Sequence, residues 1–191
     1  GNSSEILKKI PFGYLYGVDR DQTALEFSKQ RLSKIGNNFT LIHSNFSDAV
    51  DELKKIGVTH VDAILYDLGV SSPQFDNPER GFSYRFDAPL DMRMNQEDKL
   101  TAEIVVNTYS YEQLRHVIYD YGEEKFASLI AREIVNSREI KPIHTTFELV
   151  DVIKKALPNK VLSKVGHPAK QTFLGICLLY TSPSPRDRTR S

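Results

Sequence analysis

The sequence predicts an α/β fold in which a parallel sheet precedes an all-helical part. Before residue 67, segments with apolar residues at helical spacing alternate with short apolar runs, which is the pattern of βαβ units. After residue 100 only the helical pattern recurs. Between them, residues 67–94 follow neither period, yet they hold aromatic and apolar side chains that disordered segments lack. So long a loop is usually functional, and we expect it to be ordered and to hold a ligand.

The first part of the chain is expected to form three strands and three helices. Strands are expected at residues 14–18, 39–43 and 61–66, and helices at residues 3–10, 22–34 and 47–56. Ser47 is the expected cap of the third helix, which places Val50, Leu53 and Ile56 on one face. Gly57 ends that helix, because glycine tolerates the left-handed turn that follows a helix.

The second part is expected to be helical throughout. Helices are expected at residues 101–107, 110–121, 123–137 and 146–157. Thr101, Ser110 and either Thr145 or Thr146 stand where an N-cap is needed. The stretch is short for a free domain, so an insert that leans on the sheet is the better prediction. The predicted domains are a sheet domain at 1–99, which includes the loop, and a helical insert at 100–173.

Both ends of the chain depart from these patterns. Residues 174–191 read LGICLLYTSPSPRDRTRS, and LLYTSPSPRD resembles translated sequencing-adapter read-through. We therefore expect a non-native tail there, with a genuine disordered tail as the alternative. At the other end a helical pattern begins at once, which suggests that a preceding strand and turn are missing.

Composition excludes several classes of protein. Hydrophobic residues make up 40% of the chain and charged residues 26%, as in ordinary globular proteins, and no apolar run is long enough to span a membrane. The formal net charge is zero, so any nucleic-acid site must be a local patch. Cys177 is the single cysteine, which excludes an internal disulfide. The histidines are scattered, so no metal site is expected.

Two carboxylates follow predicted strands directly. Asp19 and Asp67 each come after an apolar run, and the carboxyl ends of parallel strands line the crevice in which such sheets bind ligands. There a carboxylate can accept hydrogen bonds from the hydroxyls of a ribose. Nucleotide-dependent dehydrogenases and adenosylmethionine-dependent methyltransferases both use this arrangement. Capping of a helix by Asp19 and of a turn by Asp67 are the alternatives.

Other candidate ligand residues stand on the same predicted edge. Phe46 can pack on an adenine face or serve as a core residue. Gln74 supplies an uncharged donor and acceptor, and Gly1 can be the last glycine of a turn whose amides face a cofactor.

Aromatic and basic residues gather in two stretches. The loop residues are suited to hold an unstacked base and its phosphates, or else to pack on one another. They are Arg80, Phe82, Tyr84, Arg85 and Arg93. Residues 154–170 are rich in lysine and include His167, which fits either an RNA-facing surface or an ordinary solvated helix face.

Seven motifs together resemble the bacterial 16S ribosomal RNA cytosine-N4 methyltransferase family. They are DLGVSSPQ at residues 67–74, PERGFS at 78–83, PLDMRM at 89–94, VVNTY at 105–109, YGEE at 121–124, IA at 130–131 and HPA at 167–169. The resemblance extends from Gly1 to about Phe173. It implies a Rossmann-like class I methyltransferase sheet, here incomplete, with a helical insert that recognises the substrate.

The resemblance also implies a cofactor, a partner and a site. The cofactor is S-adenosylmethionine, the partner is 16S ribosomal RNA or the small ribosomal subunit, and the location is the cytoplasm. The implied cofactor-binding residues are Gly1, Asn2, Asp19, Phe46, Asp67 and Gln74, with Asn2 in place of the family's histidine. Asp67 is the candidate catalytic residue, as acceptor of a hydrogen bond from the cytosine amine. A nucleotide-dependent oxidoreductase and a non-catalytic RNA-binding fragment are the alternative functions.

Overall fold

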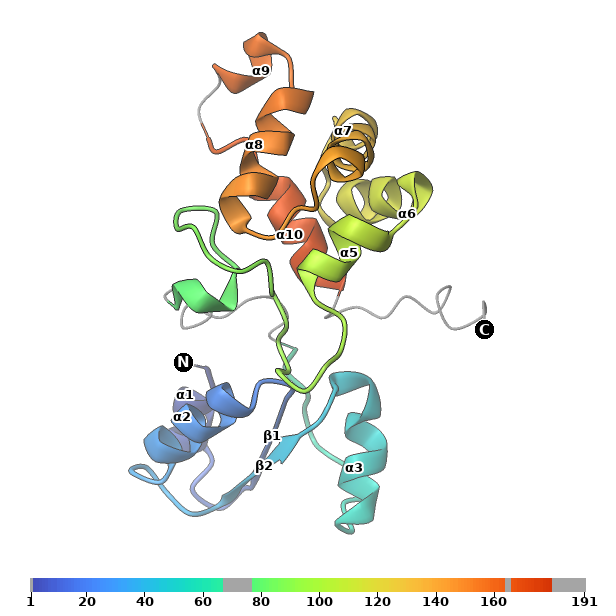
Figure 1. The fold of residues 1–191 in the computed structure, drawn as a ribbon. Coiled ribbons are helices and arrows are strands. Elements are labelled where there is room, and N and C mark those ends of the chain that lie inside the picture. Colours follow the sequence, from blue (N-terminus) through green and yellow to red (C-terminus); the bar gives the residue numbers. More distant parts are fainter. Residues whose placement is uncertain (1, 67–76, 164–165, 180–191) are drawn as a thin grey trace. The chain divides into compact units, whose positions relative to one another are not determined.

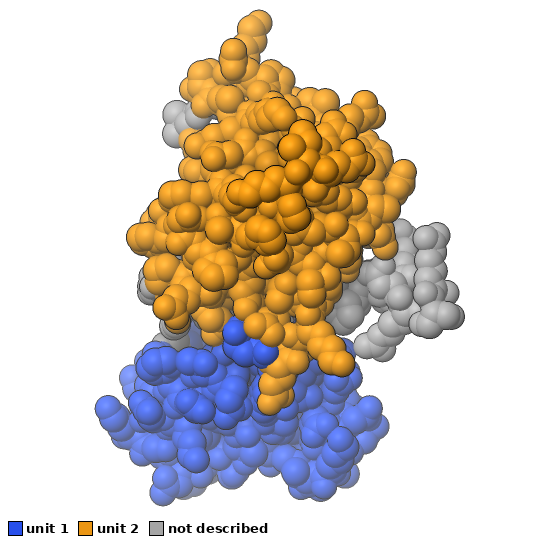
Figure 2. Space-filling model, in the orientation of Figure 1, with its two compact units in different colours: residues 1–66, 94–96 blue, residues 67–93, 97–191 orange. Residues whose placement is uncertain are grey.

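The chain folds into two compact units. A computed structural model describes residues 2–66, 77–163 and 166–179. Unit 1 comprises Gly1–Tyr66 with Met94–Gln96, and unit 2 comprises Asp67–Arg93 with Glu97–Ser191 (Figure 2). In the part of the chain that the structure describes, no helix is both long and apolar enough to cross a membrane.

Unit 1 is built on a parallel pair of strands. Its elements are α1 (Asn2–Lys9), β1 (Leu15–Asp19), α2 (Gln22–Leu32), β2 (Phe39–His43), the 3₁₀ turn η1 (Phe46–Asp48) and α3 (Ala49–Lys55). Leu15 lies opposite Phe39 and Asp19 lies opposite His43, so both strands end at the same edge. Figure 1 shows α1 and α2 on one side of the strands and α3 on the other. The first two predicted strands and their parallel pairing are thus confirmed.

The third predicted strand, at residues 61–66, is not formed. This segment is exposed along its whole length, and Leu65 keeps 61% of its surface accessible. A strand forms only where its amides and carbonyls find a neighbouring strand. Among the described residues the sheet consists of β1 and β2 alone. The prediction of a strand at residues 61–66 was therefore wrong, because an apolar run does not by itself supply a strand to pair with.

The helix predicted at residues 47–56 is present with a different start. α3 starts at Ala49, with Asp48, and not Ser47, at its N-cap position. The Asn45 side chain accepts a hydrogen bond from the amide of Ser47 (3.3 Å) and caps the preceding turn η1. Val50 and Ile56 are 60% and 52% exposed. The predicted apolar face of α3 therefore remains largely open to solvent.

Unit 2 is a bundle of helices (Figure 1). Its elements are η2 (Pro78–Arg80), α5 (Ala102–Thr108), α6 (Tyr111–His116), the π-helical turn η3 (Val117–Tyr121), α7 (Ala127–Ile140), α8 (Thr146–Ala156), α9 (Asn159–Leu162) and α10 (Lys170–Leu179). Thr101, Ser110 and Thr145 are N-caps, as predicted. Ser110 forms a capping box with Gln113, and Thr145 forms one with Glu148.

Two helix boundaries differ from the prediction. The helix expected at residues 110–121 changes from α-helical to π-helical geometry at Val117. The helix expected to start at residue 123 starts at Ala127, because the preceding residues form a turn in which the Glu124 carboxylate accepts the amide of Phe126 (2.9 Å).

The segment 77–93 is part of the core of unit 2. Phe82, Leu90 and Met92 are almost completely buried. The amide of Leu90 also donates to the carbonyl of His144 (3.0 Å), which ties the segment to the start of α8. The expected sheet domain at residues 1–99 included this segment. The structure instead groups it with the helices, because its apolar side chains are buried there.

Helix α10 crosses the expected boundary after residue 173. The helix continues to Leu179, and Ile176 and Cys177 are buried. The Cys177 thiol lies 3.6 Å from the sulfur of Met92, so α10 packs on the segment described above. The helical unit therefore extends at least to Leu179. Residues 180–191 lie outside the described residues.

Two glycines allow α10 to approach η3 closely. A β-carbon on Gly122 would collide with the carbonyl oxygen of Gln171 and lie 2.7 Å from that of Ile118. A β-carbon on Gly175 would lie 2.8 Å from the carbonyl oxygen of Val117. These neighbours are backbone atoms, which cannot rotate away.

The start of α8 predicts a pH-dependent stability. The Glu148 carboxylate accepts from the ammonium of Lys141 and the amides of His144 and Thr145. These bonds lower the pKa of Glu148 from 4.5 to about 2. We expect Glu148→Gln to reduce the free energy of unfolding at neutral pH by about 1 kcal/mol, as for a lost cap.

The effect of Glu148→Gln should depend on pH with a defined sign. A lowered pKa stabilises the fold above the unfolded-state pKa, and this stabilisation disappears as the pH falls toward the folded-state pKa. The difference from the unsubstituted chain, measured by urea unfolding, should therefore vanish between about pH 4.5 and about pH 2. Glu139→Gln, at an exposed position on α7, is the matched control. A difference that persists at the lowest pH would contradict the electrostatic cause.

Candidate functional site

The carboxyl ends of β1 and β2 carry the predicted carboxylate. Asp19 ends β1 opposite His43, the last residue of β2. The Asp19 carboxylate accepts the amide of Asp21 (2.9 Å), and the His43 ring nitrogen Nε2 lies 2.9 Å from the carbonyl oxygen of Arg20. Asp19 thus occupies the edge of the sheet where the sequence placed it.

The Asp19 carboxylate remains able to accept further hydrogen bonds. Burial of the carboxyl group among protein atoms raises the pKa of Asp19 above its usual value, although the amide of Asp21 opposes this. The residue is nevertheless exposed to solvent at the edge of the sheet, so its carboxylate is accessible. A carboxylate has about four acceptor positions, so the amide of Asp21 leaves room for a ribose diol.

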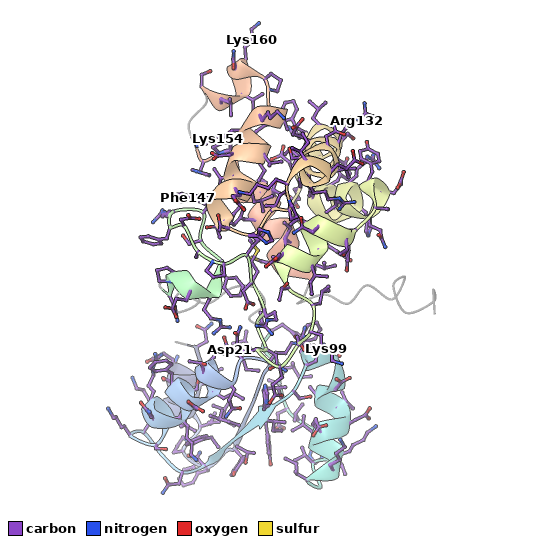
Figure 3. All side chains as sticks on the ribbon, viewed as in Figure 1. Asp21, Lys99, Arg132, Phe147, Lys154 and Lys160 are labelled. Atoms are coloured by element: carbon purple, nitrogen blue, oxygen red, sulfur yellow. The ribbon has the colours of Figure 1, made fainter. Side chains whose placement is uncertain are left out.

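Capping, the alternative role considered for Asp19, belongs to Asp21. Asp21 is buried and accepts the amide of Thr23 (3.0 Å) at the start of α2 (Figure 3). Asp19 therefore orients the residue that caps the helix, and its own carboxylate stays at the edge of the sheet.

Phe46 lies just beyond the end of β2. It is the first residue of η1 and is half-buried. Its ring meets that of Tyr66 edge-on, with centroids 6.5 Å apart. Tyr66 was not among the predicted site residues, although its position directly before Asp67 marked it as a neighbour of the site. Packing of Phe46 on an adenine remains a prediction.

Three of the predicted cofactor residues belong to the described part of the chain. Asn2 begins α1, and Asp19 and Phe46 follow the two strands. Gly1, Asp67 and Gln74 lie outside the described residues.

Arg80 and Phe82 were expected to contact substrate, but their side chains pack within the loop. Phe82 is 1% exposed, which leaves no ring face for a base. The guanidinium of Arg80 lies 5.7 Å from the Phe82 ring centroid and donates to the carbonyl of Arg93 (2.9 Å). For these two side chains the alternative of a self-packed loop describes the structure.

Arg93 is held by an ion pair within its own loop. Two of its nitrogens donate to the two carboxylate oxygens of Asp91, at 2.9 and 2.8 Å, and a third donates to the carbonyl of Asp98 (2.8 Å). Burial raises the pKa of Asp91, but the hydrogen bonds from Arg93 outweigh it, and the pKa is lowered. This network fixes the chain between residues 91 and 98.

In the predicted substrate set Tyr84 is half-buried, as Arg80 and Arg93 are, and Arg85 is exposed. The Tyr84 ring stacks on His167, with centroids 4.1 Å apart and planes 14° apart. Its other aromatic neighbour is Phe173, met edge-on at 5.9 Å. Arg85 is therefore open to solvent, whereas Tyr84 offers only the part of its ring that His167 and Phe173 leave uncovered.

A further hollow in unit 2 contains none of the predicted site residues. It has a volume of about 410 Å³ and is lined by Asp87, Ala88, Pro89, Glu103, His144 and Thr145. His144 and Glu103 pair across 2.8 Å. Within residues 2–66, 77–163 and 166–179, no three histidine, cysteine or acidic side chains are grouped to hold a metal ion.

Known proteins that resemble this chain are methyltransferases. The chain is 53% identical over 178 residues to a ribosomal RNA small subunit methyltransferase H of Oenococcus oeni, and 55% identical over 174 residues to one of Mesoplasma florum. A third, of Exiguobacterium sibiricum, is 53% identical over 176 residues. These matches cover 92%, 91% and 92% of this chain.

The chain spans little more than half the length of these relatives. It covers 57%, 56% and 56% of their sequences. The profile of the MraW methylase family matches residues 1–179, beyond the limit of about Phe173 expected from the motifs. The chain therefore belongs to the MraW methylase family, which implies the class I methyltransferase fold.

Proposed function

We propose that the protein to which this chain corresponds transfers a methyl group from S-adenosylmethionine to the N4 amine of a cytidine in 16S ribosomal RNA. The match of residues 1–179 to the MraW methylase family carries this proposal. The names of the relatives, ribosomal RNA small subunit methyltransferase H, support the substrate class. A cytoplasmic location follows from such a substrate.

The proposed cofactor site lies at the carboxyl edge of the sheet. Asp19 accepts hydrogen bonds from the ribose hydroxyls, and Phe46 packs on the adenine. Gly1, Asn2 and Gln74 complete the proposed set. Support comes from the exposed carboxylate of Asp19 at the end of β1 and from the position of Phe46 three residues after β2. When bound, the cofactor supplies a methyl group on a positively charged sulfur.

Asp67 is the proposed catalytic residue. The lone pair of the cytosine amine is delocalised into the ring, which makes the nitrogen a poor nucleophile. A carboxylate that accepts a hydrogen bond from the amine localises this lone pair and aligns it for attack. A bound cofactor would supply the methyl group that the nitrogen takes up and leave as the neutral thioether, and Asp67 would accept the proton that the nitrogen loses.

Unit 2 is proposed to recognise the RNA substrate. As a helical insert in a class I methyltransferase, it would hold the target base out of its stack, because chemistry on a base requires access to it. Tyr84 and Arg85 are the proposed contacts. Arg80, Phe82 and Arg93 are proposed to contribute by holding the loop in shape.

Isothermal titration of the chain with S-adenosylmethionine tests the function. Binding to this chain, or to the chain extended to the full length of its relatives, supports the proposal. No heat from either form would overturn it. The same titration with NADH tests the oxidoreductase alternative, which would also use Asp19. RNA binding without cofactor heat would favour the non-catalytic alternative.

Asp19→Ala should weaken cofactor binding by about ten- to a hundredfold. A hydrogen bond to a charged group contributes about 1.5–3 kcal/mol, and each 1.4 kcal/mol is tenfold in affinity. Affinity for the unsubstituted chain should also fall on acidification at a higher pH than for an ordinary aspartate, because the pKa of Asp19 is raised. Asp51→Ala, at an exposed position on α3, is the control. Equal loss from both substitutions would exclude a specific role for Asp19.

A further inference from the structure

Aromatic and basic side chains from three segments meet on the surface of unit 2. The first contact joins the loop to the start of α10, since the Tyr84 ring stacks on His167. Lys170 stands one turn further, and its amide donates to the carbonyl of His167 (3.1 Å). The loop residues that follow Tyr84 are therefore held beside the amino end of α10.

The second contact joins the same loop to α8. The Thr146 hydroxyl donates to the carbonyl of Phe86 (2.6 Å), and the amide of Phe147 donates to the Asp87 carboxylate (3.4 Å). The two phenylalanines are thus carried by backbone segments that are hydrogen-bonded together. Phe86 is 49% exposed and Phe147 is 42% exposed. Each ring offers apolar surface to solvent.

Lys154 extends the surface along α8. Lys154 lies two turns after Phe147 on α8, so both project from one side of the helix, as Figure 3 shows. The loop is hydrogen-bonded to the start of α8 and stacks on His167 through Tyr84, so it joins α8 to the start of α10. Burial and the charge of Lys154 also lower the pKa of His167.

The charges of this surface favour an anion. Lys154 and Lys170 are exposed, whereas Lys155 is paired with Glu133 at 2.6 Å. Lys160 continues the line of lysines beyond Lys154 (Figure 3). Among the described residues of the loop segment 84–87, α8, α9 and the start of α10, the exposed charged side chains other than Lys155 are the cations Arg85, Lys154, Lys160 and Lys170 and the carboxylates Asp87 and Asp151. Cations prevail here although the whole chain has a formal net charge of zero.

We propose that single-stranded RNA binds this aromatic-basic patch, which consists of Arg85, Phe86, Phe147, Lys154, His167 and Lys170. The inference rests on the proposed function and assigns the RNA a place on unit 2. Exposed rings stack on unpaired bases, and the neighbouring cations contact phosphates. Duplex RNA offers no free base faces, and an acidic protein offers no bases, so neither would use the phenylalanines in this way.

Fluorescence anisotropy with a labelled single-stranded RNA of about 16 nucleotides, the upper site size for a single-strand-binding fold, tests the patch. Phe86→Ala and Phe147→Ala should each weaken binding about tenfold, since stacking contributes about this much per base. Lys154→Ala combined with Lys170→Ala should reduce the slope of log affinity against log salt by about 1.4, because each phosphate contact contributes about 0.7. Both phenylalanines are half-exposed, so their removal should leave the fold intact, which circular dichroism checks.

Two substitutions elsewhere on unit 2 provide matched controls. Arg132→Ala removes a cation from α7, on another side of the unit (Figure 3), and Tyr119→Ala removes an exposed ring from η3. Neither should change RNA affinity by more than about twofold, and neither should change the salt slope. The proposal would be overturned if the patch variants bound the single-stranded RNA as tightly as the controls, or if duplex RNA bound as tightly as single-stranded RNA. It would also be overturned if polyglutamate displaced the RNA equally well from the unsubstituted chain and from the phenylalanine variants.

The cofactor titration separates this inference from the proposed function. Cofactor binding with no loss of RNA affinity in the patch variants would refute the patch and leave the methyltransferase proposal standing. Loss of RNA affinity in those variants, without cofactor binding by any form of the chain, would support the patch and refute the methyltransferase proposal.

Discussion

Phe82→Ala is expected to lower the free energy of unfolding of unit 2 by about 3–5 kcal/mol, as for other buried phenylalanines. The side chain is 1% exposed and lies in the segment that packs against the helices. Its removal leaves a cavity that the surrounding helices fill only in part. Urea unfolding followed by far-ultraviolet circular dichroism measures the change.

Phe86→Ala serves as the control for this substitution. The residue is of the same type on the same segment but is 49% exposed, and its loss should change the free energy of unfolding by no more than about 0.5 kcal/mol. Unchanged stability of Phe82→Ala, combined with weaker RNA binding, would instead restore the substrate contact that the sequence suggested for this ring.

Gly122→Ala is expected to destabilise unit 2 by about 3 kcal/mol, at the upper end of the usual cost of overpacking. The added methyl group would meet carbonyl oxygens of both α10 and η3. Relief requires α10 to move away, which opens the core around Ile176. The midpoint of urea unfolding should fall while its slope stays constant, since the exposed surface on unfolding is unchanged.

Gly57→Ala is the control that separates two causes of destabilisation by an added methyl group, namely lack of space and an unfavourable backbone conformation. Gly57 has φ +82° with nothing within 4 Å of the added carbon, so its cost is about 1–2 kcal/mol from the left-handed backbone alone. Gly122 has an ordinary φ of −89°. If Gly122→Ala proved no more costly than Gly57→Ala, the close approach of α10 to η3 would be disproved.

Local signals made the helices of unit 2 predictable. Ser110 with Gln113 and Thr145 with Glu148 satisfy the first amides of a helix within four residues, so the sequence alone determines where these helices start. The unpaired segment 61–66 shows the opposite case. Strand formation depends on a neighbour far away in the chain, which no local pattern reveals.

The site was predictable to the extent that it depends on position along a strand. Asp19 follows an apolar run, and this alone places it at the edge of the sheet. The roles of Phe82 and Tyr84 were not separable, because an aromatic residue in an aperiodic loop is compatible with either burial or exposure. The helices that surround them decide the outcome. The structure of residues 174–179 was likewise not determined by the local sequence, since their apolar run fits a buried helix as well as a tail.

The packing of Cys177 against Met92 makes this thiol a probe of local opening in unit 2. Burial raises the pKa of Cys177 to about 12, and only the thiolate reacts with alkylating reagents. Iodoacetamide can therefore modify this protein only when α10 separates from the segment that carries Met92. Because the chain has a single cysteine, the rate at which label accumulates reports on this opening, with no engineered probe and no background from other thiols.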